Sequence, residues 1–355
     1  MSTLDRHHTL FANIPTDLVI SLINIDRARG QATSYERQHP ERLAQLQTIA
    51  RIQSTEASNA IEGISAPAAR IRALVESDAT PTNRPEQEIA GYRKALDLIN
   101  STPPDAIRLT PGTIKQLHKI MSEYTTTPGG QFKTTDNTVE DELPDGTRRT
   151  RFHPVPAWRT EDETQRLTDT YRALAADRTI PPLLLIGTYI LDLLVIHPFS
   201  DGNGRISRLL THLLLRQAGF HVGCYVSLEK IIDDTRSTYY DALHASTIGW
   251  HEDANDPYPW LRYLVGVVIN GAYTHYEQRV GALGGRGTKT AAITTFIQSN
   301  LAEEFTIADL RAAAPSTSDA MIKKVLRDLQ REGIISPALS RGRAARYRRL
   351  KHDIS

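Results

Sequence analysis

Apolar residues recur at helical spacing along most of the chain. In 41–63, ERLAQLQTIARIQSTEASNAIEG, they fall three and four residues apart, which places them on one face of a helix. Pro40 precedes the segment and Gly63 follows it, as is usual at helix ends. The same pattern predicts helices at 84–100, 111–124, 160–176, 181–196, 205–218, 233–248 and 257–280. The fold class we expect is therefore mainly α.

The helical pattern stops between 131 and 153. Gly129-Gly130 leads into the extended run QFKTTDNTV, and Asp145-Gly146 precedes a second extended run, TRRTRFHPVP. An Asp-Gly turn between two extended runs predicts a β-hairpin, here with a loop longer than two residues.

The end of the chain has its own organisation. GALGGRGTK, residues 281–289, predicts a glycine-rich linker. Three short helical patterns follow, and Thr306 and Ser316 each precede an aspartate by three residues, as in a helix-capping box. The last segment, GIISPALSRGRAARYRRL, has a strand–turn–strand pattern. This order of elements predicts a C-terminal winged helix-turn-helix domain at 290–355.

Composition and charge narrow the choice of function. The chain has 355 residues, 40% hydrophobic, which is enough for more than one buried core. The formal net charge of +1 excludes a polycation. Residues 288–351 nevertheless carry 12 Lys and Arg against six Asp and Glu, so a basic C-terminal module follows a mildly acidic body.

Cysteine content and hydropathy predict a protein that stays in the reducing cytoplasm. Cys224 is the only cysteine, which excludes an intramolecular disulfide and makes a thiolate metal site implausible. The most apolar run, 181–196, is too short for a membrane span and contains Asp192, so it predicts a buried helix and no membrane partner. The first residues lack a signal-peptide pattern.

Residues 197–208, HPFSDGNGRISR, combine features of an anion site. His197 ends the apolar helix, and a new helix begins near Arg205 after a short loop. The free N–H groups at a helix start attract anions. Gly202 and Gly204 remove side chains, so the backbone can approach phosphate oxygens closely.

The side chains of this segment add the chemistry of group transfer. Asn203 offers a neutral donor, and Arg205 and Arg208 share a helix face on which they can clamp a polyphosphate. Asp201 supplies a hard oxygen ligand for Mg²⁺, and His197 can accept a proton near neutral pH. The combination predicts a phosphoryl- or nucleotidyl-transfer site.

The segment resembles the Fic family signature, His-x-Phe-x-Asp/Glu-Gly-Asn-Gly-Arg-x-x-Arg, at every defined position. The resemblance extends over about 40–280 and implies a Fic-type helical bundle with a β-hairpin flap. It implies a protein adenylyltransferase that moves AMP from ATP to a Tyr, Thr or Ser hydroxyl of a target protein and of itself. It also implies site roles for His197 as base, Asp201 as Mg²⁺ ligand, Gly202, Asn203, Gly204, Arg205 and Arg208 as phosphate ligands, and Phe199 as a core anchor of the loop.

Two other segments resemble nucleotide-contacting parts of Fic proteins. The predicted hairpin lies where the family carries the flap that lines the nucleotide pocket and pairs with an extended target segment. Its pocket candidates are Arg151, Phe152 and His153. RSTYYDALHAST resembles the helix whose second tyrosine, here Tyr240, contacts adenine, with Tyr239 beside it. Thr247 stands where the family often has Asn.

SNAIEG, residues 58–63, resembles the inhibitory helix motif Ser/Thr-x-x-x-Glu-Gly/Asn of self-restrained Fic proteins. Glu62 lies at a predicted helix C-terminus, where the helix dipole disfavours a negative charge unless a cation is near. The resemblance implies that this cation is Arg208 and that Glu62 restrains the enzyme in cis from the place of the γ-phosphate. Ser58 is four residues earlier and is expected to orient Glu62 by a hydrogen bond.

These patterns divide the chain into predicted parts: an N-terminal helical region at 1–105 with the inhibitory helix at 41–63, a Fic core at 106–280, the linker at 281–289 and the winged helix at 290–355. Several alternatives stay open. Related chemistry includes transfer of UMP, phosphate or phosphocholine, and removal of AMP from targets. Homodimerisation is also open.

The basic module at 290–350 suggests a DNA-binding regulator as a rival function. Its basic residues are Lys323, Lys324, Arg327 and Arg331 on a candidate recognition helix and Arg341, Arg343, Arg346, Arg348 and Arg349 on a candidate wing. A module that docks a partner or supports a dimer explains the same residues.

Overall fold

The computed structural model describes residues 2–127, 129–142, 148–284, 304–313, 319–331, 334–336 and 346–348. The chain divides into two compact units, residues 1–273 and 274–355. The described residues are mainly helical, which confirms the mainly α part of the predicted fold class. In these parts of the chain no helix is long and apolar enough to cross a membrane.

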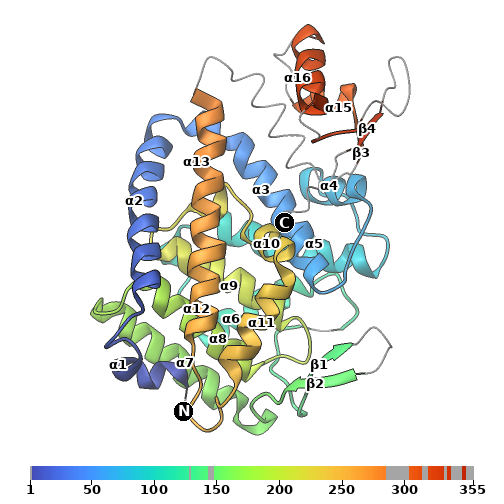
Figure 1. Ribbon diagram of the computed structural model, residues 1–355. Coiled ribbons are helices and arrows are strands. Elements are labelled where there is room, and N and C mark those ends of the chain that lie inside the picture. The colour runs from blue at the N-terminus through green and yellow to red at the C-terminus, as the bar shows by residue number, and fades with distance from the viewer. Residues whose placement is uncertain are drawn as a thin grey trace. The chain divides into compact units, whose positions relative to one another are not determined.

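The first unit is built from helices (Figure 1). They are α1 (His7–Leu10), α2 (Thr16–Gln38), α3 (Pro40–Ile61), α4 (Ala68–Glu76), α5 (Arg84–Ser101), α6 (Pro111–Met121), α7 (Ala157–Asp177), α8 (Pro182–Ile196), α9 (Asn203–Gln217), α10 (Leu228–Asp234), α11 (Arg236–Thr247), α12 (Tyr258–Leu261) and the start of α13 (Asn270–Gly284). Short 3₁₀ turns lie at Thr3–Arg6, Pro104–Ala106 and Val222–Cys224, and a π-helical stretch, Arg262–Ile269, joins α12 to α13.

Most predicted helices appear within a few residues of their predicted bounds, with one clear difference. The pattern predicts a single helix over 233–248, whereas the structure has α10 and α11 on either side of Thr235. The Thr235 hydroxyl donates to the Ile231 carbonyl and contacts the Tyr263 hydroxyl at 2.8 Å. The Thr235 backbone, with φ −117° and ψ 32°, lies outside the helical region, so α10 ends at this residue.

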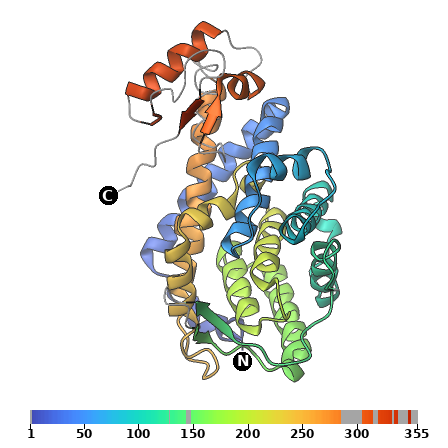
Figure 2. The ribbon, with the colours of Figure 1, turned by 90° about the vertical axis from the view of Figure 1, so that its right-hand side faces the viewer.

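Helices α8 and α9 form the centre of the first unit. The apolar run predicts a buried helix, and nearly every side chain of α8 is buried. Helix α9 contacts α3, α5, α6 and α8. Figure 2 shows α8 and α9 as neighbouring yellow-green helices. The loop between them, which carries the predicted chemistry, is therefore held by buried helices on both sides.

Two short strands pair at the place of the predicted hairpin. Strand β1 (Val139–Glu142) is antiparallel to β2 (Arg148–Phe152), with Val139 opposite Phe152 and Glu142 opposite Arg148. The predicted turn at Asp145-Gly146 lies outside the described residues.

The second unit contains β3 (Glu304–Thr306), α15 (Ile307–Ala313), α16 (Asp319–Arg331) and β4 (Arg346–Arg348), with β3 antiparallel to β4. The predicted capping box of α15 is present: Thr306 N–H donates to Asp309 Oδ2 at 2.8 Å, and Asp309 N–H donates to Thr306 Oγ1 at 3.3 Å. Ser316 lies outside the described residues. Helix α13 continues to Gly284, so helix covers the first residues of the predicted linker, and 285–289 lie outside the described part.

Asp192 in α8 ties the start of the chain to the core. Its side chain is fully buried and accepts hydrogen bonds from Thr3 N–H at 3.0 Å, Leu4 N–H at 3.1 Å and Trp250 Nε1 at 2.7 Å. Burial raises the pKa of this carboxyl, whereas the three donors oppose the shift. The polar residue in the apolar run therefore has a structural role.

We predict that Asp192→Ala lowers the free energy of unfolding of the first unit by about 2–4 kcal/mol, because buried donors lose their acceptor. The three tryptophans, Trp158, Trp250 and Trp260, all lie in this unit, so tryptophan fluorescence in urea measures its unfolding. The control is Asp169→Ala on α7, whose side chain is mostly exposed and which we expect to change stability by less than about 0.5 kcal/mol. Equal losses in the two variants would contradict the structural role.

Candidate active site

His197 directly follows the buried helix α8, as its C-terminal cap, and begins the loop that leads to α9. Its backbone is left-handed, with φ +52°, which is uncommon for a residue with a side chain and concentrates at functional sites. Nδ1 lies 3.2 Å from the Leu194 carbonyl oxygen, so Nδ1 carries the proton and Nε2 has the free lone pair. Burial lowers the pKa of His197 to about 4, so the ring is neutral at pH 7.

Two glycines shape the start of α9. Gly202 precedes the helix with φ +79°, and a β-carbon there would lie 2.7 Å from Met121 Cε. A β-carbon on Gly204 would lie 2.3 Å from Glu62 Oε1 and 3.1 Å from Arg208 Nη1. Only glycine leaves the first turn of α9 open at these positions. The Glu62 carboxylate lies next to this first turn, on the side that Gly204 leaves free.

Asn203 braces the loop and has a different partner from the one predicted. The sequence suggests that its amide offers a donor to a phosphate. In the structure Nδ2 donates to the Phe199 carbonyl at 2.7 Å, and Oδ1 accepts from Phe199 N–H at 2.9 Å. Because both ends of the amide bond one residue across the loop, Asn203 fixes the loop's shape, and the backbone and arginines are left to meet an anion.

Asp201 and Arg205 precede and follow the Gly202–Gly204 segment in the sequence. The Asp201 side chain is 77% exposed, and its Oδ1 is 3.7 Å from Arg205 Nη2. Arg205 is buried, and its Nη1 donates to Glu88 Oε2 on α5 at 2.7 Å. Glu88 was not predicted from the sequence, since nothing in its own segment marks it as an arginine partner. It fixes Arg205 through a buried ion pair and leaves Asp201 open to solvent.

Arg208 is buried against the last turn of α3. Its Nη2 donates to Glu62 Oε1 at 2.7 Å and to the Ser58 carbonyl at 2.8 Å, and its Nε donates to Ser58 Oγ at 2.8 Å. The Arg208–Glu62 contact is the one that the sequence predicts. Burial opposes the charged form of Arg208, but the Glu62 carboxylate raises the pKa of this guanidinium above its ordinary value.

Ser58 contacts a different group from the one predicted. The spacing suggests a hydrogen bond to Glu62, whereas the hydroxyl accepts from Arg208 Nε. The guanidinium reaches between the two residues and needs acceptors on its inner edge, which the Ser58 hydroxyl and carbonyl supply. Ser58 therefore acts on Glu62 indirectly, by fixing the arginine that Glu62 bonds.

Arg208 has unused donor capacity. Among the described residues, its buried Nη1 has no hydrogen-bond partner. Buried donors are normally paired, so an orphan of this kind calls for an acceptor that another molecule can bring. Nη1 lies beside Gly204 over the first turn of α9. A phosphate group could accept from Nη1 and from the free backbone N–H groups at the start of α9. The Glu62 carboxylate lies next to the same atoms.

His118 on α6 holds the loop between α8 and α9 through hydrogen bonds and a ring contact. Gly130 N–H donates to Nδ1 at 2.9 Å, so Nε2 carries the proton and donates to the Asp201 carbonyl at 3.0 Å. The ring also stacks on Phe199, with centroids 3.8 Å apart and planes 3° apart. Burial lowers the pKa of His118, which keeps the neutral tautomer that both bonds require.

Lys133 supports the other end of the loop. It is buried, and its Nζ donates to Asn137 Oδ1 at 2.8 Å and to the Ile196 carbonyl at 3.2 Å. Its N–H donates to the Pro198 carbonyl at 2.8 Å. Burial lowers the pKa of Lys133 to about 8, and its charge helps to lower the pKa of His197. Neither Lys133 nor His118 was predicted from the sequence; a histidine on the apolar face of 111–124 was the available signal.

The two tyrosines that were predicted to lie at the nucleobase differ in burial. Tyr239 is buried and packs edge-on against Tyr240 and Trp260. Tyr240 is partly exposed, and the Arg151 guanidinium lies over its ring at 4.5 Å. The structure thus brings β2 and α11 together, as the predicted pocket requires, but gives Tyr239 a packing role.

The remaining flap candidates contact the loop after α11. Phe152 stacks on His251, with centroids 5.4 Å apart and planes 6° apart. His251 Nε2 donates to the His153 carbonyl at 2.7 Å, while the His153 side chain is exposed. Phe152 and the backbone of His153 therefore fasten β2 to the helical unit.

In the described residues, no group of three or more His, Cys, Asp or Glu side chains could hold a metal ion. The sequence assigns the Mg²⁺ ligand to Asp201, whose side chain is mostly exposed. A single exposed carboxylate fits Mg²⁺, which binds proteins through one or two carboxylates when substrate phosphates complete its shell.

Comparison with known sequences points to the same region. Residues 108–215 match the profile described as the Fic/DOC family. Protein adenylyltransferase fic-1 of Caenorhabditis elegans is 28% identical over 213 residues, 58% of this chain and 37% of that protein. Protein adenylyltransferase Fic of Nematostella vectensis is 28% identical over 214 residues, 58% of this chain and 44% of that protein. The match thus spans less than half the length of these relatives.

Solved structures show the same fold. A Fic family protein from Desulfovibrio desulfuricans G20 superimposes with a TM-score of 0.61 at 20% identity, covering 95% of this chain and 97% of that one. A Fic domain containing signaling protein from Bacteroides thetaiotaomicron VPI-5482 has a TM-score of 0.60 at 24% identity, covering 71% and 94%. The chain therefore shares the Fic fold, and the His197 loop lies within the matched family region.

We predict that His118→Ala loosens the loop. Losing its hydrogen bonds should lower the free energy of local opening of the loop by about 1–2 kcal/mol. This corresponds to roughly tenfold faster amide exchange in the peptide 198–204 and at Gly130. Hydrogen–deuterium exchange measures this directly. His118→Gln keeps a donor and an acceptor and should restore part of the protection, while the α7 peptides serve as an internal control. Unchanged exchange in 198–204 would show that His118 does not support the loop.

Proposed function

We propose that this chain is a Fic-type protein adenylyltransferase, which moves AMP from ATP to a hydroxyl side chain of a target protein and of itself. The observation that carries the proposal is the arrangement at the start of α9. A neutral histidine, an open backbone turn and the unpaired Nη1 of Arg208 converge there beneath Glu62. The family match of residues 108–215 and relatives named protein adenylyltransferase support the same chemistry.

In the proposed reaction His197 is the general base. Its Nε2 accepts the proton of the target hydroxyl, because Nδ1 is already bonded to the Leu194 carbonyl. The hydroxyl oxygen attacks the α-phosphorus of ATP, and the bond to the β-phosphate breaks, which releases pyrophosphate. The first-turn amides of α9 and the Arg205 guanidinium bind the phosphates. Mg²⁺, held by Asp201 and phosphate oxygens, would neutralise phosphate charge.

We propose that Glu62 restrains this reaction in cis. Its carboxylate accepts from the same guanidinium edge that a γ-phosphate would require, and it covers Gly204. An anion cannot take that place while the carboxylate remains. Because α3 precedes the core in the same chain, the restraint needs no partner protein. The same glutamate is also a candidate base for removing AMP from a target.

Target and nucleobase recognition are assigned to the paired strands and α11. Strand β2 has an edge to which an extended target segment could add as a further strand. Arg151 over Tyr240 provides a cationic and aromatic surface for a base. The intact loop at 202–208 favours nucleotide transfer over simple phosphate transfer, since it offers donors for a whole triphosphate.

We predict that Glu62→Gly increases protein labelling by about 10- to 100-fold, because a charge-assisted bond of about 1.5–3 kcal/mol no longer holds Arg208. The purified variant is incubated with Mg²⁺ and ATP labelled at the α-phosphorus or at the γ-phosphorus. Label should appear on protein from the α-labelled nucleotide only, with an adenylyl mass increase. Glu62→Gln, which keeps an acceptor but loses the charge, should be intermediate.

The matched control is Glu62→Gly combined with His197→Ala, which should lose labelling, since it keeps the opened loop but has no base. Label transferred from the γ-position would instead identify a phosphotransferase. No label from either nucleotide, on the variant or on lysate proteins, would reject the function.

We further predict the pH dependence of kcat/KM in the Glu62→Gly variant. Burial lowers the pKa of His197 to about 4, and the neighbouring Glu62 charge raises it, so removing Glu62 lowers it further. The base is active when deprotonated, so activity should stay constant as the pH falls from 8 to about 6 and should decrease only below the ordinary histidine value. A midpoint of the acid limb at or above 6.5 would contradict the assignment of His197.

A further inference from the structure

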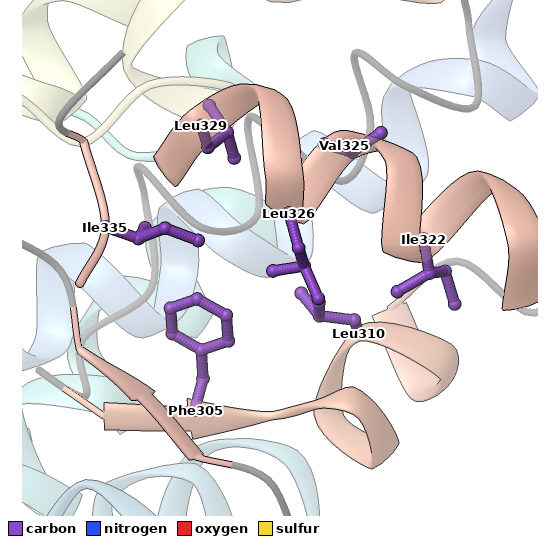
Figure 3. Close-up of a cluster of buried hydrophobic side chains, with 7 residues drawn as sticks. All are labelled: Phe305, Leu310, Ile322, Val325, Leu326, Leu329 and Ile335. Atoms are coloured by element: carbon purple, nitrogen blue, oxygen red, sulfur yellow. The ribbon is translucent and has the colours of Figure 1, made fainter. Parts of the chain in front are cut away.

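Helix α16 has two opposite faces. Its buried face packs on residues from α15, β3 and the segment 334–336, as Figure 3 shows. The buried residues of this cluster are Phe305, Leu310, Ile322, Val325, Leu326, Leu329 and Ile335. A helix turns about 100° per residue, so Lys323, Lys324, Arg327 and Arg331 fall within an arc of about 100° on the side roughly opposite the buried face. All four side chains are exposed.

Most of the charge on this basic face, defined as Lys323, Lys324, Arg327 and Arg331, is not neutralised. Arg331 lies 3.6 Å from Asp328. Among the described residues, no carboxylate lies within ion-pair distance of the other three cations. The strand arginines differ, since Arg348 is 2.6 Å and Arg346 is 3.9 Å from Glu304.

Among the described residues of this unit, the positive charge that no carboxylate neutralises therefore lies mainly on α16, and less on β4. The strand arginines serve in part to hold β4 against β3 through Glu304. The other predicted wing residues, Arg341, Arg343 and Arg349, lie outside the described part of the chain.

The composition of the basic face favours a polyanion over a protein partner. The cores of protein–protein interfaces are depleted of charge and contain aromatic and aliphatic anchors. The exposed positions between 322 and 331 of α16 carry only Lys and Arg. Phosphate backbones, by contrast, are bound mainly through Lys and Arg.

The dimensions of α16 match duplex DNA. Its 13 residues span about 20 Å, and the major groove, about 12 Å wide, admits a single helix. The apolar face holds the helix on its own small core, so the basic face projects outward. We propose that residues 319–331 form a DNA-contacting helix, and that this unit binds duplex DNA chiefly through phosphate contacts. The proposal is independent of the transferase function.

The test uses the full chain and a fluorescein-labelled DNA duplex of mixed sequence, followed by fluorescence anisotropy over a salt series. With up to four phosphate contacts at about 0.9 each, log Kd should rise linearly with log salt concentration, with a slope of about 3 to 4. The variant Lys323→Glu/Arg327→Glu should bind at least tenfold more weakly at low salt, with a slope smaller by about 2. Both positions are exposed, so the fold should tolerate the change.

The matched control is Arg27→Glu/Arg37→Glu on α2, which alters two exposed cations and the same total charge. It should keep its DNA affinity within about threefold. A second, milder variant, Lys324→Gln/Arg331→Gln, should weaken binding in the same direction without introducing acid. Circular dichroism compares the helix content of all variants with the unmodified chain.

Three results would overturn the proposal. The first is no DNA binding at the lowest salt. The second is an equal loss in the basic-face and α2 variants, which would show a response to overall charge. The third is binding to polyglutamate but not to DNA, which would assign the face to an acidic protein.

Discussion

A buried guanidinium needs an anion, and the site depends on how Arg208 meets that need. Its side chain is 4% exposed, and taking its charge out of water is expensive unless a partner compensates. In this chain the compensation comes from Glu62 and Ser58 on the last turn of α3. A triphosphate could supply the same compensation from outside. Under the proposed function, the inhibited and the nucleotide-bound states would satisfy one electrostatic requirement in two ways.

The loop beneath this pair gains its shape from buried neighbours. Asn203 bridges the loop, His118 holds the Asp201 carbonyl, and Lys133 holds the carbonyls of Ile196 and Pro198. These contacts come from the first residue of α9, from α6 and from the segment before the paired strands. They explain how a turn with two left-handed residues, His197 and Gly202, stays in one conformation.

The sequence predicts the parts of the site that are contiguous and periodic. The buried α8, a helix start near Arg205 and the Arg208–Glu62 pair all follow from local patterns or from a family motif. Glu88, His118 and Lys133 could not be predicted, because the site residues that they bond lie 63 or more positions away in the sequence and are brought to them by packing. Ser58 is a similar case. Its four-residue spacing from Glu62 predicts a hydrogen bond between the two, but in the structure the Ser58 hydroxyl accepts from Arg208 Nε.

We propose that Glu62 and the γ-phosphate compete for Arg208. The most direct measurement is the affinity of the chain and of its Glu62→Gly variant for ATP and for ADP, by isothermal titration calorimetry with Mg²⁺. If the two anions compete, losing the carboxylate should tighten ATP binding by about tenfold or more while leaving ADP binding nearly unchanged. An ATP-to-ADP affinity ratio that is the same in both proteins would contradict the account.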